Sequence, residues 1–197
     1  MRDMNNDSRT SRRSFLKLGG LVTLGGLFAL AAPAGAQAMT TVLAGPRRVS
    51  GRRRLVLHNI HTGETERCVF ADRGRYLPEG LARVNHLLRD HRTGDVHEID
   101  PALLDLLHDL ADELDVAPEY DVISGYRCPA TNALLRRRSK GVASHSYHMQ
   151  GKAVDIRLRG VDLPRLHRTA LAERRGGVGF YSASGFVHLD TGPVRSW

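Results

Sequence analysis

The sequence predicts an α+β domain in which a small antiparallel sheet is flanked by helices. Helical spacing of apolar residues dominates the middle of the chain, and strand-like alternation dominates its last third. No internal repeat is visible, which argues against a solenoid. Helices that come mainly before the strands, rather than alternating with them, are typical of an α+β fold. The predicted domain spans residues 54–197.

The domain begins with a predicted hairpin. Residues 54–58 and 64–70 have strand character, and His61-Thr62-Gly63 supplies the turn between them. A helix over about 79–90 follows from leucines and a valine at helical spacing. Asp100-Pro101 opens a second, leucine-rich helix, with the aspartate as N-cap and the proline in the first turn.

The second half of the domain carries the remaining strands. The predicted elements are, in order, a strand at 120–124, a helix that begins at 129, a loop at 139–148, a strand at 153–158, a helix at 163–174 and a hairpin of 177–181 and 186–190. Alternation in the strand at 153–158 places Ala153, Asp155 and Arg157 on one face.

The first 38 residues have the pattern of a twin-arginine export signal. Arg12-Arg13 is followed by an uncharged run from Leu18 to Pro33 and by two A-x-A cleavage sites, at 34–36 and 36–38. The alternative is a retained anchor, but this run is shorter than the ~20 apolar residues of a membrane span. We therefore expect passage through the twin-arginine translocase, cleavage, and no membrane span in the mature protein.

Composition limits the partners of the exported chain. Cleavage after Ala38 leaves 24 Lys/Arg and 19 Asp/Glu, so the net charge is +5 with histidine neutral. Residues 39–53 are expected to be a linker, and the rest has the size of one domain. The mild positive charge suits an anionic wall polymer. The arginine runs at 52–54 and 136–138 have few aromatic neighbours, so they are interpreted as solvated faces rather than a nucleic-acid site.

Two cysteines, Cys68 and Cys128, lie far apart in the sequence. In an exported protein they could form a disulfide. They could equally be buried thiols, because the twin-arginine route carries proteins that fold in the reducing cytoplasm. The sequence leaves both alternatives open, and it leaves the oligomeric state open as well.

Metal-ligating residue types concentrate in two places near the C-terminus. His148 precedes Asp155 by seven residues, with Gly151 between them to permit a sharp turn, and His188 is followed by Asp190. Two imidazoles and one carboxylate are a sufficient ligand set for a catalytic zinc that keeps its fourth position for water. Asp190 shares a strand face with His188, so it is a candidate general base or a partner that orients His188. The pattern predicts a zinc hydrolase.

The ordered pattern carries a family resemblance. Ser146-x-His148-x-x-Gly151-x-Ala153-x-Asp155 with a later His188 resembles the zinc peptidase superfamily of lysostaphin, D-Ala-D-Ala carboxypeptidases and hedgehog signalling domains. Four further segments resemble its YcbK-like branch of exported murein endopeptidases: 124–127 (SGYR), 131–132 (TN), 176–181 (GGVGFY) and 186–197. The resemblance extends from about Arg54 to the C-terminus.

This resemblance implies a fold, a site and a substrate. His148, Asp155 and His188 would bind Zn²⁺, and Arg127 would stabilise the negative oxygen of the tetrahedral intermediate. The substrate would be peptidoglycan in the periplasm, cut at peptide cross-links between stem peptides, including links between two diaminopimelate residues.

One departure from the superfamily pattern concerns the general base. Carboxypeptidase members often carry a glutamate three residues before the last zinc histidine, and Gly185 stands there in this chain. Asp190 is the nearest carboxylate that could replace it, and His145 is the alternative from the loop. A D-Ala-D-Ala carboxypeptidase and a non-catalytic, murein-binding zinc module are the competing functions.

Overall fold

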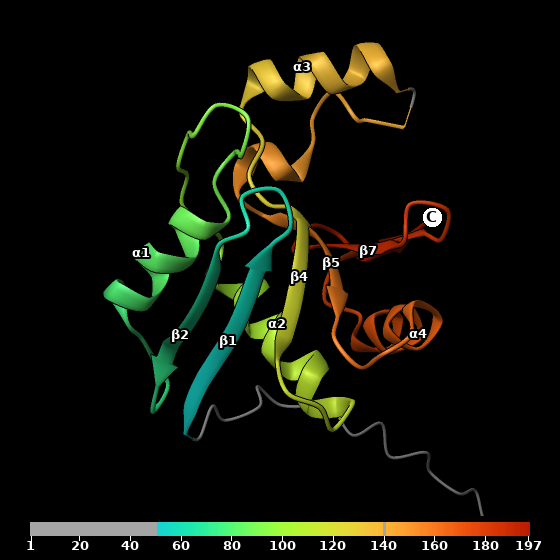
Figure 1. Cartoon of the computed structure of the whole chain (residues 1–197). Helices are drawn as coiled ribbons and strands as arrows, with labels where there is room; N and C mark the ends of the chain where they lie inside the picture. Colours follow the sequence, from blue (N-terminus) through green and yellow to red (C-terminus); the bar gives the residue numbers. More distant parts are fainter. Residues whose placement is uncertain (1–50, 140) are drawn as a thin grey trace, which may run out of the picture. The chain divides into compact units, whose positions relative to one another are not determined.

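A mixed sheet of eight strands, in the order β3-β2-β1-β4-β5-β7-β6-β8, runs through the protein. It is seen in a computed structural model that describes residues 51–139 and 141–197 (Figure 1). The predicted export signal and most of the predicted linker lie outside the described residues. The first strand begins at Arg52, two residues before the predicted start of the domain.

The first half of the fold contains the predicted hairpin and both predicted helices. Its elements are β1 (Arg52–Asn59), β2 (Thr65–Asp72), the short β3 (Arg75–Tyr76), α1 (Pro78–Leu87) and α2 (Pro101–Glu113). Asp100 caps α2 as predicted, because its side chain accepts a hydrogen bond from the Ala102 amide at 3.0 Å.

The second half follows the predicted order, with three short additions. Its elements are β4 (Glu119–Ser124), α3 (Pro129–Arg138), the 3₁₀ turn η1 (Tyr147–Gln150), β5 (Ala153–Leu158), α4 (Leu163–Glu173), β6 (Gly177–Tyr181), β7 (Phe186–Asp190) and β8 (Arg195–Ser196). The strands β3 and β8 and the turn η1 are too short to leave a periodic signal.

The prediction of a small antiparallel sheet was wrong. The N-terminal hairpin joins the C-terminal strands in one sheet, because β1 pairs in parallel with β4, opposing Leu57 to Tyr120. The β6–β8 pair is also parallel, and the other pairs are antiparallel. A parallel pair needs a long crossover connection, here α1 and α2, and alternation shows which face a strand buries but not which strand it joins. The broader α+β assignment is confirmed.

The two faces of the sheet differ in character. One face packs on α1, α2 and α4, and its buried side chains include Leu55, Leu57, Tyr120, Ile156 and Leu189. Because side chains alternate along a strand, Asp155 and His188 lie on the other face. None of the helices in residues 51–139 and 141–197 is long and apolar enough to cross a membrane.

Both cysteines are buried and free in the structure, which is the second of the two predicted alternatives. Cys68 lies in β2, and burial raises the pKa of its thiol to about 11. Cys128 is the N-cap of α3, and its sulfur accepts a hydrogen bond from the Thr131 amide at 3.4 Å.

Candidate metal centre

Two adjacent strands and one turn bring the predicted ligands together. Asp155 on β5 and His188 on β7 are directly opposite in the antiparallel pairing. His148 comes from η1, whose N-cap is Ser146 and whose C-cap is Gly151. Gly151 has φ +66°, and a Cβ there would meet the Glu98 carbonyl oxygen at 1.9 Å. Only glycine therefore fits the turn that carries the chain from His148 to Asp155.

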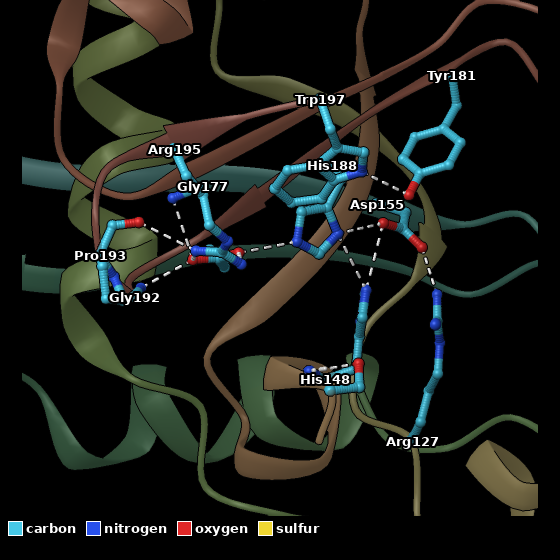
Figure 2. Close-up of polar contacts among 12 residues, drawn as sticks. Arg127, His148, Asp155, Gly177, Tyr181, His188, Gly192, Pro193, Arg195 and Trp197 are labelled. Atoms are coloured by element: carbon cyan, nitrogen blue, oxygen red, sulfur yellow. Dashed lines mark hydrogen bonds and ion pairs between the residues drawn. The ribbon is translucent and has the colours of Figure 1, made fainter. Parts of the chain in front are cut away.

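Three ligand atoms converge on one point. His148 Nε2 lies 3.2 Å from His188 Nδ1 and 3.3 Å from Asp155 Oδ1, and His188 Nδ1 lies 2.8 Å from that oxygen (Figure 2). All three side chains are buried. Among the described residues, His148, Asp155 and His188 are the histidine, cysteine or acidic side chains that lie close enough together, as a group of three or more, to hold a metal ion.

The hydrogen-bond partners of the outer nitrogens show which nitrogen of each imidazole carries the hydrogen. The other nitrogen of each ring faces the shared point with a lone pair. His148 Nδ1 lies 2.7 Å from the Gly125 carbonyl oxygen, which can only accept, so this nitrogen carries the hydrogen. His188 Nε2 lies 3.1 Å from Asp190 Oδ2 and donates to that carboxylate. The two remaining nitrogens and Asp155 Oδ1 are therefore three acceptors that face one another. Such an arrangement is stable only with a cation between them, either a proton or a metal ion.

The spacing of the three acceptors matches a tetrahedral ion. Ligand atoms at ~2.0–2.1 Å from a tetrahedral zinc ion lie about 3.3 Å apart. The separations of 3.2 and 3.3 Å agree with that value, and the His188–Asp155 separation of 2.8 Å is about 0.5 Å shorter. The donor set of two imidazoles and one carboxylate also suits such an ion. The residues present therefore fit a small divalent metal.

The pKa values of the three groups follow from their shared burial. Burial lowers the pKa of His148 and outweighs the raising effect of Asp155. Burial also acts to lower the pKa of His188, but hydrogen bonds to Asp155 and Asp190 raise it overall. Burial acts to raise the pKa of Asp155, yet the two imidazoles and Arg127 hold it well below its usual range. The carboxylate is therefore ionised, which a metal ligand requires.

Arg127 contacts Asp155 directly. One of its terminal nitrogens donates to Asp155 Oδ2, and its Nε donates to Ser124 Oγ at 2.7 Å. The pairing occupies the outer carboxylate oxygen and leaves Oδ1 for the metal. A guanidinium has five N–H donors, so Arg127 keeps donors for a substrate oxygen in the cavity that it lines.

Asp190 faces away from the convergent atoms. It contacts only the outer nitrogen of His188, and it also accepts hydrogen bonds from the Gly177 and Gly192 amides at 3.1 and 2.8 Å. Arg195 binds both carboxylate oxygens, at 3.0 and 2.6 Å. Burial acts to raise the pKa of Asp190, but these donors hold it well below its usual range. A fully occupied, ionised carboxylate suits the orientation of an imidazole better than proton transfer.

A cavity of about 600 Å³ opens over the three ligands. One wall is a set of aromatic side chains around an arginine that sequence reasoning missed. The Arg195 guanidinium lies 5.1 Å from the centre of the Tyr147 ring and 5.0 Å from that of Trp197. Trp197 Nε1 donates to the Tyr181 hydroxyl at 2.8 Å. Only the clustering of aromatic residues and glycines near the C-terminus hinted at this wall.

The loop that follows α3 and leads into η1 also lines the cavity. Residues 139, 141–143 and 145–147 line the cavity, and His145 is its one imidazole, among the described lining residues, outside the ligand set. Ser144 Oγ lies 3.2 Å from His145 Nδ1. Gly185 lies in the β6–β7 turn at φ +71°, against the Arg157 guanidinium.

Buried histidines and a carboxylate that converge at the bottom of an open cavity define a metal-dependent hydrolase as the class of protein. A family model described as "Peptidoglycan L,D-endopeptidase MepK", of the M15 peptidases, matches residues 47–197. The chain belongs to this family.

Curated relatives support the assignment. The chain is 44% identical over 187 residues to the peptidoglycan L,D-endopeptidases MepK of Escherichia coli and Shigella flexneri, covering 95% of this chain and 97% of theirs. A probable MepK of Haemophilus influenzae is 44% identical over 144 residues, 73% of this chain and 77% of its own. No solved structure matches the chain.

Proposed function

We propose that the protein is a zinc-dependent peptidoglycan L,D-endopeptidase that cuts the cross-links between stem peptides. The observation that carries the proposal is the convergence of two imidazole nitrogens and a carboxylate oxygen on one point that borders a cavity. Membership of the MepK family supplies the substrate class. An L,D bond joins an L centre to a D centre, as in a link between two diaminopimelate residues.

His148, Asp155 and His188 would hold the zinc ion, each through the atom that faces the shared point. When bound, zinc would supply a Lewis acid that polarises the scissile carbonyl and makes water acidic enough to attack it. Asp190 keeps the His188 ring in its orientation and tautomer, and Arg195 keeps Asp190 ionised. Asp190 is thus an orienting group rather than the base.

Arg127 would act on both the site and the substrate. Its pairing with Asp155 holds that ligand in place, and its free N–H groups can donate to the oxygen that gains negative charge in the transition state. His145 is the candidate proton acceptor, since Asp155 is the one carboxylate among the described residues that line the cavity, and it is committed as a ligand.

The test is hydrolysis of isolated murein by the zinc-loaded protein, followed by chromatography of the muropeptides. Dimers joined through two diaminopimelate residues should fall and monomers should rise, while dimers joined through D-alanine stay constant. Release of free D-alanine from monomeric pentapeptides would instead establish a carboxypeptidase. Unchanged dimers at full zinc occupancy would refute the endopeptidase proposal.

The proposed place of action is the periplasm, which the substrate requires. The supporting sequence features are the paired arginines, apolar run and A-x-A sites of residues 1–38. Replacing Arg12-Arg13 with two lysines should leave uncleaved protein in the cytoplasm, measured by fractionation and immunoblotting. Normal export of that variant would refute the twin-arginine route.

A further inference from the structure

The positive charge of the chain is concentrated in one segment. Between Asp121 and Asp155 the sequence contains no aspartate or glutamate but six Lys/Arg. The remainder of residues 39–197 has 18 Lys/Arg and 19 Asp/Glu, so it is nearly neutral. The net positive charge of the expected mature chain therefore resides in residues 122–154.

This segment lies at the end of the sheet that carries the candidate metal centre. It leaves β4, forms α3 and the loop that lines the cavity, and returns through η1 into β5. Figure 1 shows α3 beyond the end of β4. The residue directly after α3, Ser139, already lines the cavity. The charged end of the helix is thus continuous with one wall of the cleft.

Arg136, Arg137 and Arg138 form the exposed last turn of α3. Arginines at the C-terminus of a helix can stabilise its last carbonyls. At an exposed helix end this stabilisation is weak and is screened by salt, so it leaves the guanidinium groups open to a ligand. Among the described residues none of the three forms an ion pair, whereas Arg53, Arg89 and Arg159 each do. Their charge is available to a ligand.

We propose that residues 136–138 form a cationic rim that binds the carboxylates of polymeric murein and holds the polymer beside the cleft. Murein peptides are acidic because their glutamate and diaminopimelate residues retain free carboxylates. The inference rests on the proposed function, since it concerns a second contact with the same substrate. The ligand class is a polycarboxylate peptide on a polymer, and the rim adds affinity for intact wall material without touching the bond that is cut.

The test compares two triple variants that lose the same charge. Arg136→Gln/Arg137→Gln/Arg138→Gln removes the rim, and Arg73→Gln/Arg75→Gln/Arg168→Gln removes three other exposed arginines. Arg73 lies in the β2–β3 turn, Arg75 in β3 and Arg168 on α4, all outside the residues that line the cavity. Arg73 lies at the far end of the sheet, because Asp72 pairs with Arg52 at the start of β1, and β1 runs parallel to β4. The measurement is co-sedimentation of the full chain with isolated murein at low and high salt.

The rim variant should bind intact murein about tenfold more weakly at low salt, since each exposed ion pair contributes little and the three act together. The difference should disappear at high salt because salt screens exposed charges. A lysine triple at 136–138 should restore binding, and thermal melts of all variants confirm folding. Cleavage of a small soluble cross-linked dimer should be equal in the wild type and the rim variant.

Three outcomes would overturn the proposal that the cationic rim binds murein. These are unchanged binding in the rim variant, equal loss in both glutamine triples, and stronger binding to vesicles of anionic phospholipid than to murein. Failure of the wild type to cleave the soluble dimer counts against the endopeptidase proposal instead. The sedimentation result is independent of turnover, so the two failures are distinguishable.

Discussion

The polar cluster around Arg53 and the cluster of the candidate metal ligands differ in where their polar atoms point. In the first, Arg53 pairs with Asp105 and Asp109, and Asp109 also binds Arg175 at 2.5 Å. In the second, the facing atoms of His148, Asp155 and His188 are all acceptors.

The difference shows that burial of charge does not by itself identify a functional site. The Arg53 cluster is balanced, with two arginines against two aspartates, and it links β1 to α2 and to the segment after α4. The histidine cluster instead turns three acceptor atoms toward one point, and its residues line a cavity. Orientation toward partners indicates a structural role, and orientation toward a shared point indicates a ligand.

The largest expected effect is on the histidine cluster. His188→Ala should lose bound zinc and reduce turnover by more than the roughly 100-fold that loss of an outer partner can cost. The decrease in the free energy of unfolding should be smaller than for Arg53→Met, because the three acceptors repel one another when no metal is bound. Zinc content, murein cleavage and urea unfolding measure these effects, with His58→Ala as control. Full zinc content in His188→Ala would contradict the assignment of His188 as a metal ligand.

Arg127 should affect chemistry more than metal content. Arg127→Ala is expected to lower kcat about 10²–10³-fold, the usual cost of losing a donor to a developing oxyanion. Zinc per chain should stay near one, because all three ligands remain. Steady-state kinetics on a soluble cross-linked dimer measures the change. A rise in KM with unchanged kcat would show that Arg127 binds substrate without stabilising the transition state.

The Arg53 cluster should affect stability alone. Arg53→Met leaves buried carboxylates with too little compensating charge and should lower the free energy of unfolding by about 3–5 kcal/mol. Zinc affinity and turnover of the folded fraction should not change. The matched control is Arg52→Met, because the neighbouring Arg52 side chain is 76% exposed. Equal effects of the two variants in urea unfolding would contradict the structural role of this cluster.

Asp190 should have a smaller effect, through His188. Asp190→Asn should weaken zinc affinity or turnover about 10–100-fold, as is usual for a partner that orients a metal-bound imidazole. Asp121→Asn is the control, since Asp121 is outside the cavity and pairs with Arg159 at 2.6 Å. Complete loss of turnover with unchanged zinc affinity would instead favour Asp190 as the general base.

Substitution of Asp90 should have the smallest effect on the free energy of unfolding, and this effect should depend on pH. This carboxylate accepts hydrogen bonds from the Cys128 and Arg92 amides at 2.9 and 3.0 Å. Burial acts to raise its pKa, but these bonds and one from Thr131 lower it overall. A lowered folded-state pKa adds stability above the unfolded value of ~3.9 that is lost as the pH falls further.

Asp90→Asn should therefore cost about 1–2 kcal/mol at neutral pH, the penalty for an unmatched buried hydrogen bond. The difference from wild type should shrink below a pH of about 4. Urea unfolding at several pH values measures it. A constant difference across this range would show that the carboxylate charge is not involved.

The family pattern pointed to the three residues that the structure brings together, but local sequence could not assign the role of Asp190. A strand places His188 and Asp190 on one face, which holds for a base and for an orienting partner alike. The choice depends on Gly177, Gly192 and Arg195, which surround Asp190 through tertiary contacts. Arg195 itself was missed because arginine near a chain end has no distinctive spacing.

The amino-acid sequence was enough to predict the longer helices and strands, the capped start of α2, the turn at Gly151 and the family resemblance. These depend on local periodicity, backbone conformation and an ordered motif. The folded structure was needed to show that the N-terminal hairpin joins the C-terminal strands through the β1–β4 pair. It also decided which nitrogen of each histidine faces the shared point. Both depend on contacts between distant residues, and alternation along one strand does not encode them.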